Sequence, residues 1–185
     1  MNQKCLAALG GSGGKTGWRC LFGATAAQYV QTPLFVLNSK FDTWQEKAII
    51  GVNCSVAACP ANEQVFWGAY GKKMVAAAAS LPAQHGAFVT NCPSHCQTGT
   101  ASDWQKRTIN GKVEGAAFTE WYLDQQAGGK KVFKYVEDCD EVLHAAKSVP
   151  RRLFRPPRSR HWHRSRKRLR CMKCKSSSSG CESNR

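Results

Sequence analysis

The sequence has 185 residues, enough for one domain with a buried core, but its positive charge is unevenly distributed. Residues 150–185 contain thirteen Lys and Arg against one Glu and so carry +12 of the net charge of +15, which leaves residues 1–149 nearly neutral. The basic isoelectric point therefore does not identify the domain as a nucleic-acid binder, and no apolar run in the sequence is long enough to cross a membrane.

The first twenty residues contain Cys5 and Cys20 on either side of a glycine-rich segment. Gly10 to Gly14 matches G-x-S-x-G, the nucleophile elbow in which a strand turns sharply into a helix and exposes a serine. Only Leu6 to Leu9 could form that strand, and Lys15 onward is a poor helix start. A glycine-rich disulfide loop is therefore the favoured interpretation, and the elbow is the alternative.

The next informative stretch is YVQTPLFVLNSKFDTWQ, from Tyr29 to Gln45. Leu34 to Leu37 is a continuous apolar run, typical of a strand buried on both faces of a parallel sheet. The chain leaves this strand before Asp42, which places its carboxylate at the carboxyl edge of the sheet. The alternative role of Asp42 is to cap a helix that starts at Thr43.

Cys54 and Cys59 enclose a short loop that we expect to be bridged, and residues 62–80 then read as a helix. Its periodicity predicts an inward face that serves packing, with Lys72 and Lys73 in solvent. The residues of this expected face are Val65, Phe66, Ala69, Tyr70, Ala76 and Ala77.

The stretch HGAFVTNCPSHCQ organises the second half of the sequence. Residues 86–90 favour a buried strand, and the turn that follows presents His95 at the edge where ligands of open α/β sheets collect. Cys92 and Cys96 bracket His95 and fit either a disulfide-stiffened loop or a metal site. The disulfide is favoured because structural zinc sites usually combine a CxxC pair with a distant second pair. The plainer alternative is a loop histidine without a task.

The rest of the domain reads as a polar loop, a helix and a short strand. Residues 98–111 are loop-like, and Trp104 within them could line a cleft. A helix is expected over 112–126, with Gly128 and Gly129 ending it. A final strand is expected over 132–136, followed by Cys139 with no evident partner.

Residues 150–185 have the composition of a disordered basic tail with electrostatic affinity for polyanions, which truncation at Pro150 would abolish. A zinc site is the alternative, although its spacing matches no known finger. Its ligands would come from Cys171, Cys174, Cys181, His161 and His163. A translated intron or a shifted reading frame would also explain the segment.

Asp42 and His95 occur in the chain order of the last two members of the Ser-Asp-His triad of α/β-hydrolases. These types suit that chemistry because an imidazole can take a serine proton, and a carboxylate fixes its tautomer and stabilises the imidazolium. The sequence therefore predicts that the two side chains meet at one edge of the sheet.

Several motifs, in order, resemble the C-terminal part of the pectin acetylesterase and Notum-type carboxylesterase family. They are TPLFVLNSKFDTWQ, the Cys54-x-x-x-x-Cys59-Pro loop with its helix, and GAFVTNCPSHCQ followed by AFTEWY. The resemblance implies an α/β-hydrolase fold with a mostly parallel sheet and flanking helices, and a secreted enzyme that cleaves acetyl esters of pectin or another acyl ester. It also implies Asp42 as the acid, His95 as the base, disulfides 5 with 20 and 54 with 59, and no cofactor or metal.

The sequence departs from the family at the nucleophile. In the family this serine lies in a G-x-S-A-G-G elbow upstream of the segment that matches Cys5, and Ser12 does not take its place. Ten cysteines suit an oxidising compartment, yet residues 1–15 lack the apolar core of a signal peptide. We therefore expect residues 1–149 to be the C-terminal portion of a secreted hydrolase without its nucleophile. The alternative is a non-catalytic, cysteine-braced module whose basic tail binds polyanions.

Overall fold

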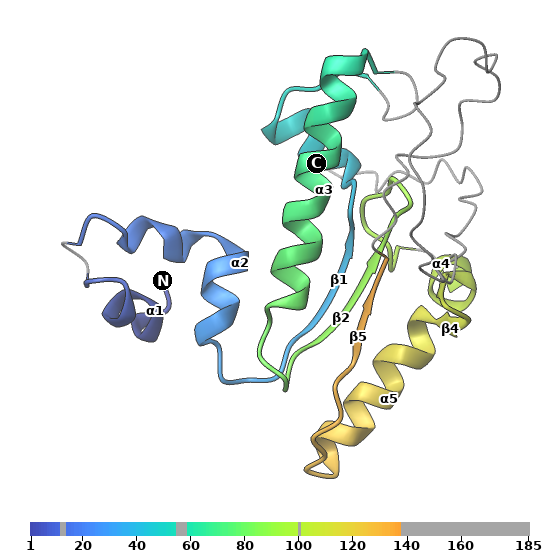
Figure 1. Ribbon diagram of the computed structural model, residues 1–185. Coiled ribbons are helices and arrows are strands. Elements are labelled where there is room, and N and C mark those ends of the chain that lie inside the picture. Colours follow the sequence, from blue (N-terminus) through green and yellow to red (C-terminus); the bar gives the residue numbers. More distant parts are fainter. Residues whose placement is uncertain (12–13, 55–58, 100, 138–185) are drawn as a thin grey trace, which may run out of the picture.

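The computed structural model describes residues 1–11, 14–54, 59–99 and 101–137 (Figure 1). The predictions made for Ser12, Cys139 and residues 150–185 lie outside these ranges. The helices are α1 (Gln3–Ala8), η1 (Gly17–Leu21), α2 (Gly23–Ala26), η2 (Ala27–Tyr29), η3 (Gln45–Ile49), α3 (Ala61–Ala79), α4 (Ala101–Lys106) and α5 (Glu114–Gln126). The strands are β1 (Phe35–Ser39), β2 (Gly86–Thr90), β3 (Thr108–Ile109), β4 (Lys112–Val113) and β5 (Lys134–Val136).

Three parallel strands form the main sheet in the order β1-β2-β5. Leu37 pairs with Phe88, and Phe88 with Tyr135, so the strands run in register. Parallel neighbours need crossover connections, which α3 supplies between β1 and β2 and α5 between β2 and β5 (Figure 1). The expected α/β class with a parallel sheet and flanking helices is confirmed.

The two crossover helices cover opposite faces of the sheet. Ala87 and Val89 of β2 pack with Ala78 of α3 on one face. On the other face Phe88, between them in sequence, packs with Ala117 of α5. Strand side chains alternate between faces, so a strand covered on both sides needs apolar side chains on both, as Ala87, Phe88 and Val89 provide. All five residues of β2 are accordingly buried.

β1 is an edge strand among the described residues, and this changes its burial. The sequence predicts burial on both faces for Leu34 to Leu37, but these residues are only half-buried. Among the described residues, no strand therefore pairs with the outer edge of this apolar strand.

The inward face of α3 differs from the one predicted from periodicity. Trp67, Gly71 and Ala78 are buried, whereas Val65 is 76% exposed and Phe66 43% exposed. The second half of the helix is rich in alanine, so its faces differ little in hydrophobicity. The sequence pattern therefore allows more than one face of the helix to point toward the core. Trp67 determines which face is buried, because it is the largest side chain available to fill the space beside Phe41.

Residues 98–111 are not the loop that their polarity predicts. They contain α4 and the strand β3, which pairs with β4 in a hairpin. Asn110 and Gly111 both have positive φ, as the two central residues of a type I′ turn require. The helix expected from 112 accordingly begins at Glu114. Trp104 contacts Gly115 and lies 5.6 Å from Phe118 between ring centroids, so it packs α4 onto α5.

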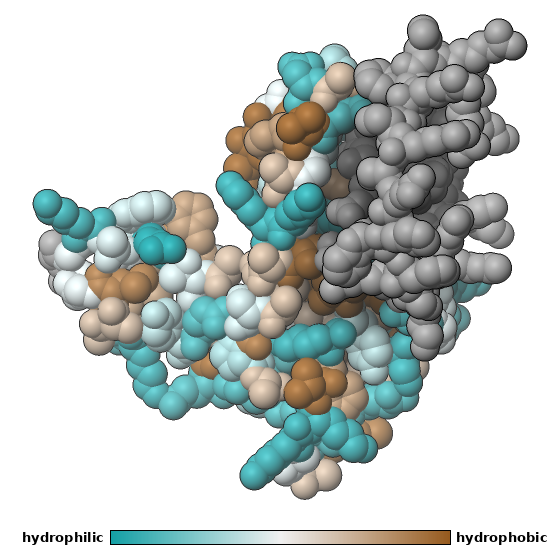
Figure 2. All heavy atoms as spheres, in the orientation of Figure 1, coloured by the Kyte–Doolittle hydropathy of each residue, from teal (hydrophilic) through white to brown (hydrophobic). Residues whose placement is uncertain are grey.

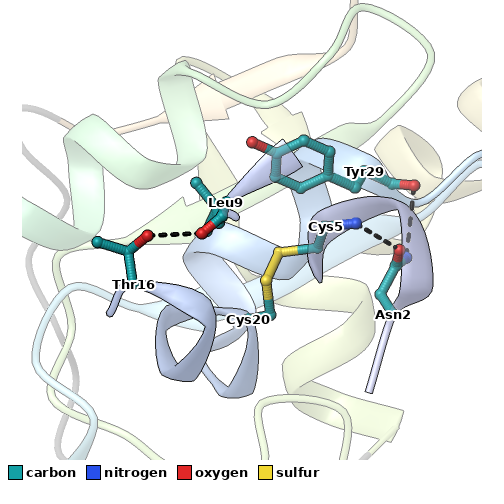
Figure 3. The surroundings of a disulfide bond; sticks show 6 residues. All are labelled: Asn2, Cys5, Leu9, Thr16, Cys20 and Tyr29. Carbon is teal, nitrogen blue, oxygen red and sulfur yellow. Dashed lines mark hydrogen bonds between the residues drawn. A yellow bond between two sulfur atoms is a disulfide. The ribbon is translucent and has the colours of Figure 1, made fainter. Parts of the chain in front are cut away.

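The N-terminal segment is held together by the Cys5–Cys20 disulfide between α1 and η1 (Figure 3). Leu6 to Ala8 are helical, so the strand that a nucleophile elbow would need before Gly10 is not formed. His85 ties this segment to the sheet. Its Nδ1 accepts from the Leu34 N–H at 3.1 Å, and its Nε2 donates to the Ala27 carbonyl at 3.1 Å.

Apolar side chains remain exposed at several places on the surface, among them two regions that Figure 2 shows. Figure 2 shows apolar surface over the start of α3 and over the N-terminal segment. The large exposed apolar residues of these regions are Ile49, Val65, Phe66, Trp18, Leu21 and Phe22. None of the helices in the described part of the chain is both long and apolar enough to cross a membrane.

Candidate active site

Asp42 and His95 meet beyond the carboxyl ends of β1 and β2. His95 Nδ1 lies 2.9 Å from Asp42 Oδ2 and 3.1 Å from Oδ1. A carboxylate can only accept, so the proton of the neutral imidazole is on Nδ1. His95 Nε2 has no hydrogen-bond partner within the described ranges. The Asp42 side chain is 7% exposed and that of His95 37%, so the acid is enclosed and the base remains accessible.

Asp42 also performs the capping role that its sequence position offers. Its Oδ1 accepts the backbone N–H of Trp44 at 3.0 Å and that of Gln45 at 2.9 Å. Such bonds satisfy donors at the start of a helical turn and fix the carboxylate against the backbone. The two interpretations of Asp42 are therefore compatible: the cap orients the oxygens that hold His95.

The hydroxyl of Ser39 joins the two loops that carry the pair. Ser39 Oγ donates to the Cys92 carbonyl at 2.6 Å and accepts the Phe41 N–H at 2.9 Å. The Ser94 N–H donates to the Phe41 carbonyl at 3.3 Å. Phe41 directly precedes Asp42, and Ser94 directly precedes His95. The hydrogen bonds between the two loops therefore hold both members of the pair in place.

Two disulfide-bonded cysteines lie on either side of His95, and Arg107 contacts the same loop. Cys92 and Cys96 are both disulfide-bonded, which leaves no thiolate for the metal alternative. Cys96 has φ of 52°, an uncommon conformation for a residue with a side chain. Buried Arg107 donates to Ser94 Oγ at 3.2 Å and pairs with Glu114, its Nε 3.7 Å from Oε2.

Burial raises the pKa of Glu114 to about 7, against the opposing charge of Arg107. Glu114 is fully enclosed, and its carboxylate oxygens have no hydrogen-bond partner in the described part of the chain.

A cavity of about 350 Å³ opens beside His95. Most of its lining residues are polar in type, and they come from β1 and the two loops: Leu37, Asn38, Asp42, Gln45, Ser94, His95, Cys96, Gln97 and Thr98. Gln97 Nε2 donates to Thr90 Oγ1 at 3.0 Å, and the Tyr70 hydroxyl donates to Gln45 Oε1. The cavity thus offers fixed amide and hydroxyl groups next to the imidazole, as a site for a polar substrate requires.

One group of metal-ligand types occurs among the described residues, outside this cavity. Cys54, Cys59 and Glu63 lie close together. Because the two sulfurs form a disulfide, they cannot act as thiolate ligands.

Glu46 makes the stability of the chain depend on pH. Burial, followed by the charge of Asp42, raises its pKa from 4.5 to about 7, and its Oε1 has no partner among the described residues. The folded state thus binds more protons than the unfolded state between these pH values. The contribution of Glu46 to stability is therefore fully present below pH 4.5 and is lost as the pH rises through 7.

Glu46→Gln should therefore stabilise the chain at pH 8 by up to roughly 3 kcal/mol, and by progressively less toward pH 5. Urea unfolding at pH 5, 6, 7 and 8 measures the difference. Glu120→Gln, at an exposed carboxylate, is the control and should give a small difference at every pH. A gain from Glu46→Gln that does not change between pH 5 and 8 would contradict the assignment.

Three residues of this arrangement have no predicted role in the sequence. Ser39 and Arg107 act through partners 53 and 13 positions away, and no local pattern reveals such contacts. Trp44 belongs to the quoted DTWQ motif, and its position two residues after Asp42 is the only signal that could have pointed to it.

Comparison with known proteins adds the family. The profile of the family described as Pectinacetylesterase matches residues 1–144. The chain belongs to this family. The extent of the match shows that the family segment includes both loops of the candidate site.

Relatives in the family are longer than this chain. Pectin acetylesterase 11 of Arabidopsis thaliana is 27% identical over 123 residues, which cover 57% of the chain and 32% of that protein. Pectin acetylesterase 7 of the same plant is 30% identical over 100 residues, 46% of the chain and 25% of that protein. The chain therefore spans about a third or less of the length of these two relatives.

A solved structure supports the fold. The Wnt deacylase Notum from Drosophila superposes with a TM-score of 0.55 at 19% identity, covering 74% of the chain and 35% of that protein. Together with the parallel sheet and its two crossover helices, this likeness places the chain in the α/β-hydrolase class.

Proposed function

We propose that the chain is the C-terminal part of a carboxylic ester hydrolase that removes acetyl groups from pectin or a similar acylated polysaccharide. The observation that carries the proposal is the hydrogen bond between His95 Nδ1 and an Asp42 carboxylate that is itself fixed by two backbone N–H groups. Membership of the pectinacetylesterase family supports the substrate class. The disulfides suit an extracellular location.

In this mechanism His95 is the general base and then the general acid. Its Nε2 takes the proton of the serine hydroxyl as the serine oxygen attacks the acetyl carbonyl, and Asp42 stabilises the imidazolium through Nδ1–H. The proton then passes to the departing sugar oxygen, which leaves an acetyl-enzyme. Water, deprotonated by the same nitrogen, attacks this ester, and the imidazolium returns the proton to the serine oxygen as acetate leaves.

In this proposal the serine belongs to the part of the longer relatives that the chain does not match, upstream of it as the family resemblance implies. Two features of the chain favour this. It spans about a third of pectin acetylesterase 11, and its apolar strand β1 has an open side at the edge of the described sheet. Exposed apolar patches of the kind seen over α3 usually mark an interaction surface.

The test compares hydrolysis of p-nitrophenyl acetate by two proteins. One is the chain as it stands, and the other is the chain joined to the segment of pectin acetylesterase 11 that precedes the match. We expect turnover from the joined protein and little from the chain alone. Intact pectin acetylesterase 11 is the positive control, and circular dichroism checks that both proteins fold.

Two outcomes would contradict the proposal. A folded joined protein without turnover would count against the esterase assignment. Turnover by the chain alone that Ser12→Ala abolishes would show that the nucleophile lies at Gly10 to Gly14 after all.

A further inference from the structure

The indole of Trp44 stacks on the imidazole of His95. Their ring centroids are 5.7 Å apart and the planes differ by 23°. Trp44 also donates its backbone N–H to Asp42 Oδ1 at 3.0 Å. One residue therefore contacts both members of the pair, the acid through its main chain and the base through its ring.

The exposure of Trp44 shows that this stack is not part of the core. Trp44 is 53% exposed, whereas Trp67 of the same region is fully buried among Phe41, Phe66 and Tyr70. Among the described residues, the indole of Trp44 contacts the ring of His95. A half-exposed indole whose ring contact is a half-exposed imidazole contributes little to folding. Stability of the fold therefore does not explain why Trp44 lies against His95.

We propose that Trp44 is a positioning residue for His95. This inference rests on the proposed function, because it assigns Trp44 a part in presenting the base. The indole covers one face of the imidazole and limits rotation of the ring, while Asp42 holds Nδ1. Together these two contacts fix the orientation of the imidazole and hence the direction in which Nε2 points.

Trp44 also favours the charged state of His95 that turnover would create. A cation over an aromatic face within about 6 Å of the ring centroid is attracted by the ring quadrupole, and the stacking distance lies inside this limit. The attraction exists only while the imidazole carries the serine proton, so it acts on the transition state more than on substrate binding.

The first experiment needs no esterase activity and uses the full chain. Diethyl pyrocarbonate modifies accessible imidazole nitrogens, and peptide mapping by mass spectrometry follows His95 separately. Trp44→Leu and Trp44→Gln should each speed modification of His95 several-fold, and Trp44→Phe should keep the rate of the original chain. His85 is fully buried and reports on the fold, because it stays unmodified as long as the chain is folded.

A second measurement examines the original chain alone. In the NMR spectrum the ring protons of His95, assigned through His95→Gln, should show nuclear Overhauser contacts to the Trp44 indole. Their absence, or unchanged His95 modification in both non-aromatic variants with His85 protected, would overturn the proposal.

Kinetics then separate positioning from binding in the joined protein. Trp44→Leu should lower kcat about 2- to 5-fold, as expected for a cation–aromatic contact at a partly exposed site, with KM unchanged and recovery in Trp44→Phe. A change confined to KM would refute positioning. The modification and NMR results do not depend on ester turnover, so failure of the proposed function and failure of this inference give different results.

Discussion

Replacing Asp42 by asparagine should lower ester turnover of the joined protein about 10⁴-fold, the scale found when a triad aspartate becomes an amide. The side-chain oxygen of asparagine can still accept the Trp44 and Gln45 N–H groups, so the cap persists. The amide no longer carries the charge that fixes Nδ1–H and stabilises the imidazolium. The substitution therefore separates the two roles of Asp42: catalysis is lost, and the fold remains.

The controls for this substitution use both roles. Asp124→Asn changes a carboxylate that accepts the Lys131 N–H far from the site, and should leave turnover unchanged. His95→Ala should also abolish turnover, and the double variant should be no worse than the more severe single one, because the two residues act as a unit. If Asp42→Asn greatly lowered the unfolding temperature, the loss of turnover would follow from loss of the fold. Capping would then be the main role of Asp42.

The sequence predicts the elements that carry the site because their signals are local. Residues 86–90 form a short apolar run with turn residues behind it, and the structure has a strand with these bounds. The periodicity predicts a helix over residues 62–80, and α3 spans Ala61–Ala79. The carboxyl ends of neighbouring parallel strands lie at one edge, so the placement of Asp42 near His95 also follows from sequence.

The remaining features depend on contacts between distant residues. Ser39 binds the Cys92 carbonyl across the strand ends, and the fifty-three positions between them leave no pattern to read. The helix α4 is too short and polar to show periodicity, and it is held by packing of Trp104 on Gly115. The sequence does not show which face of α3 is buried, because alanine dominates the second half of the helix. A tertiary contact of Trp67 determines that face instead.

That contact leads to the largest expected effect on stability. Trp67 is fully buried, forms an edge contact with Phe41 at 6.3 Å between centroids, and donates its Nε1–H to Cys59 Sγ at 3.3 Å. Trp67→Ala removes this ring from a closed space and should cost about 3–5 kcal/mol, from lost burial and from the cavity that remains. Phe41 directly precedes Asp42, so the loss should also loosen the acid.

Phe66→Ala is the matched control, since periodicity alone would place Phe66 rather than Trp67 inside. Phe66 is 43% exposed, and its truncation should cost only about 1 kcal/mol, the usual effect of a single substitution. Urea unfolding at pH 5 compares the two variants, both of which keep Glu46 and so share its pH-dependent contribution. Equal costs, or a larger cost for Phe66→Ala, would mean that α3 turns its other face to the core, which would also displace Phe41 and the Asp42 that follows it.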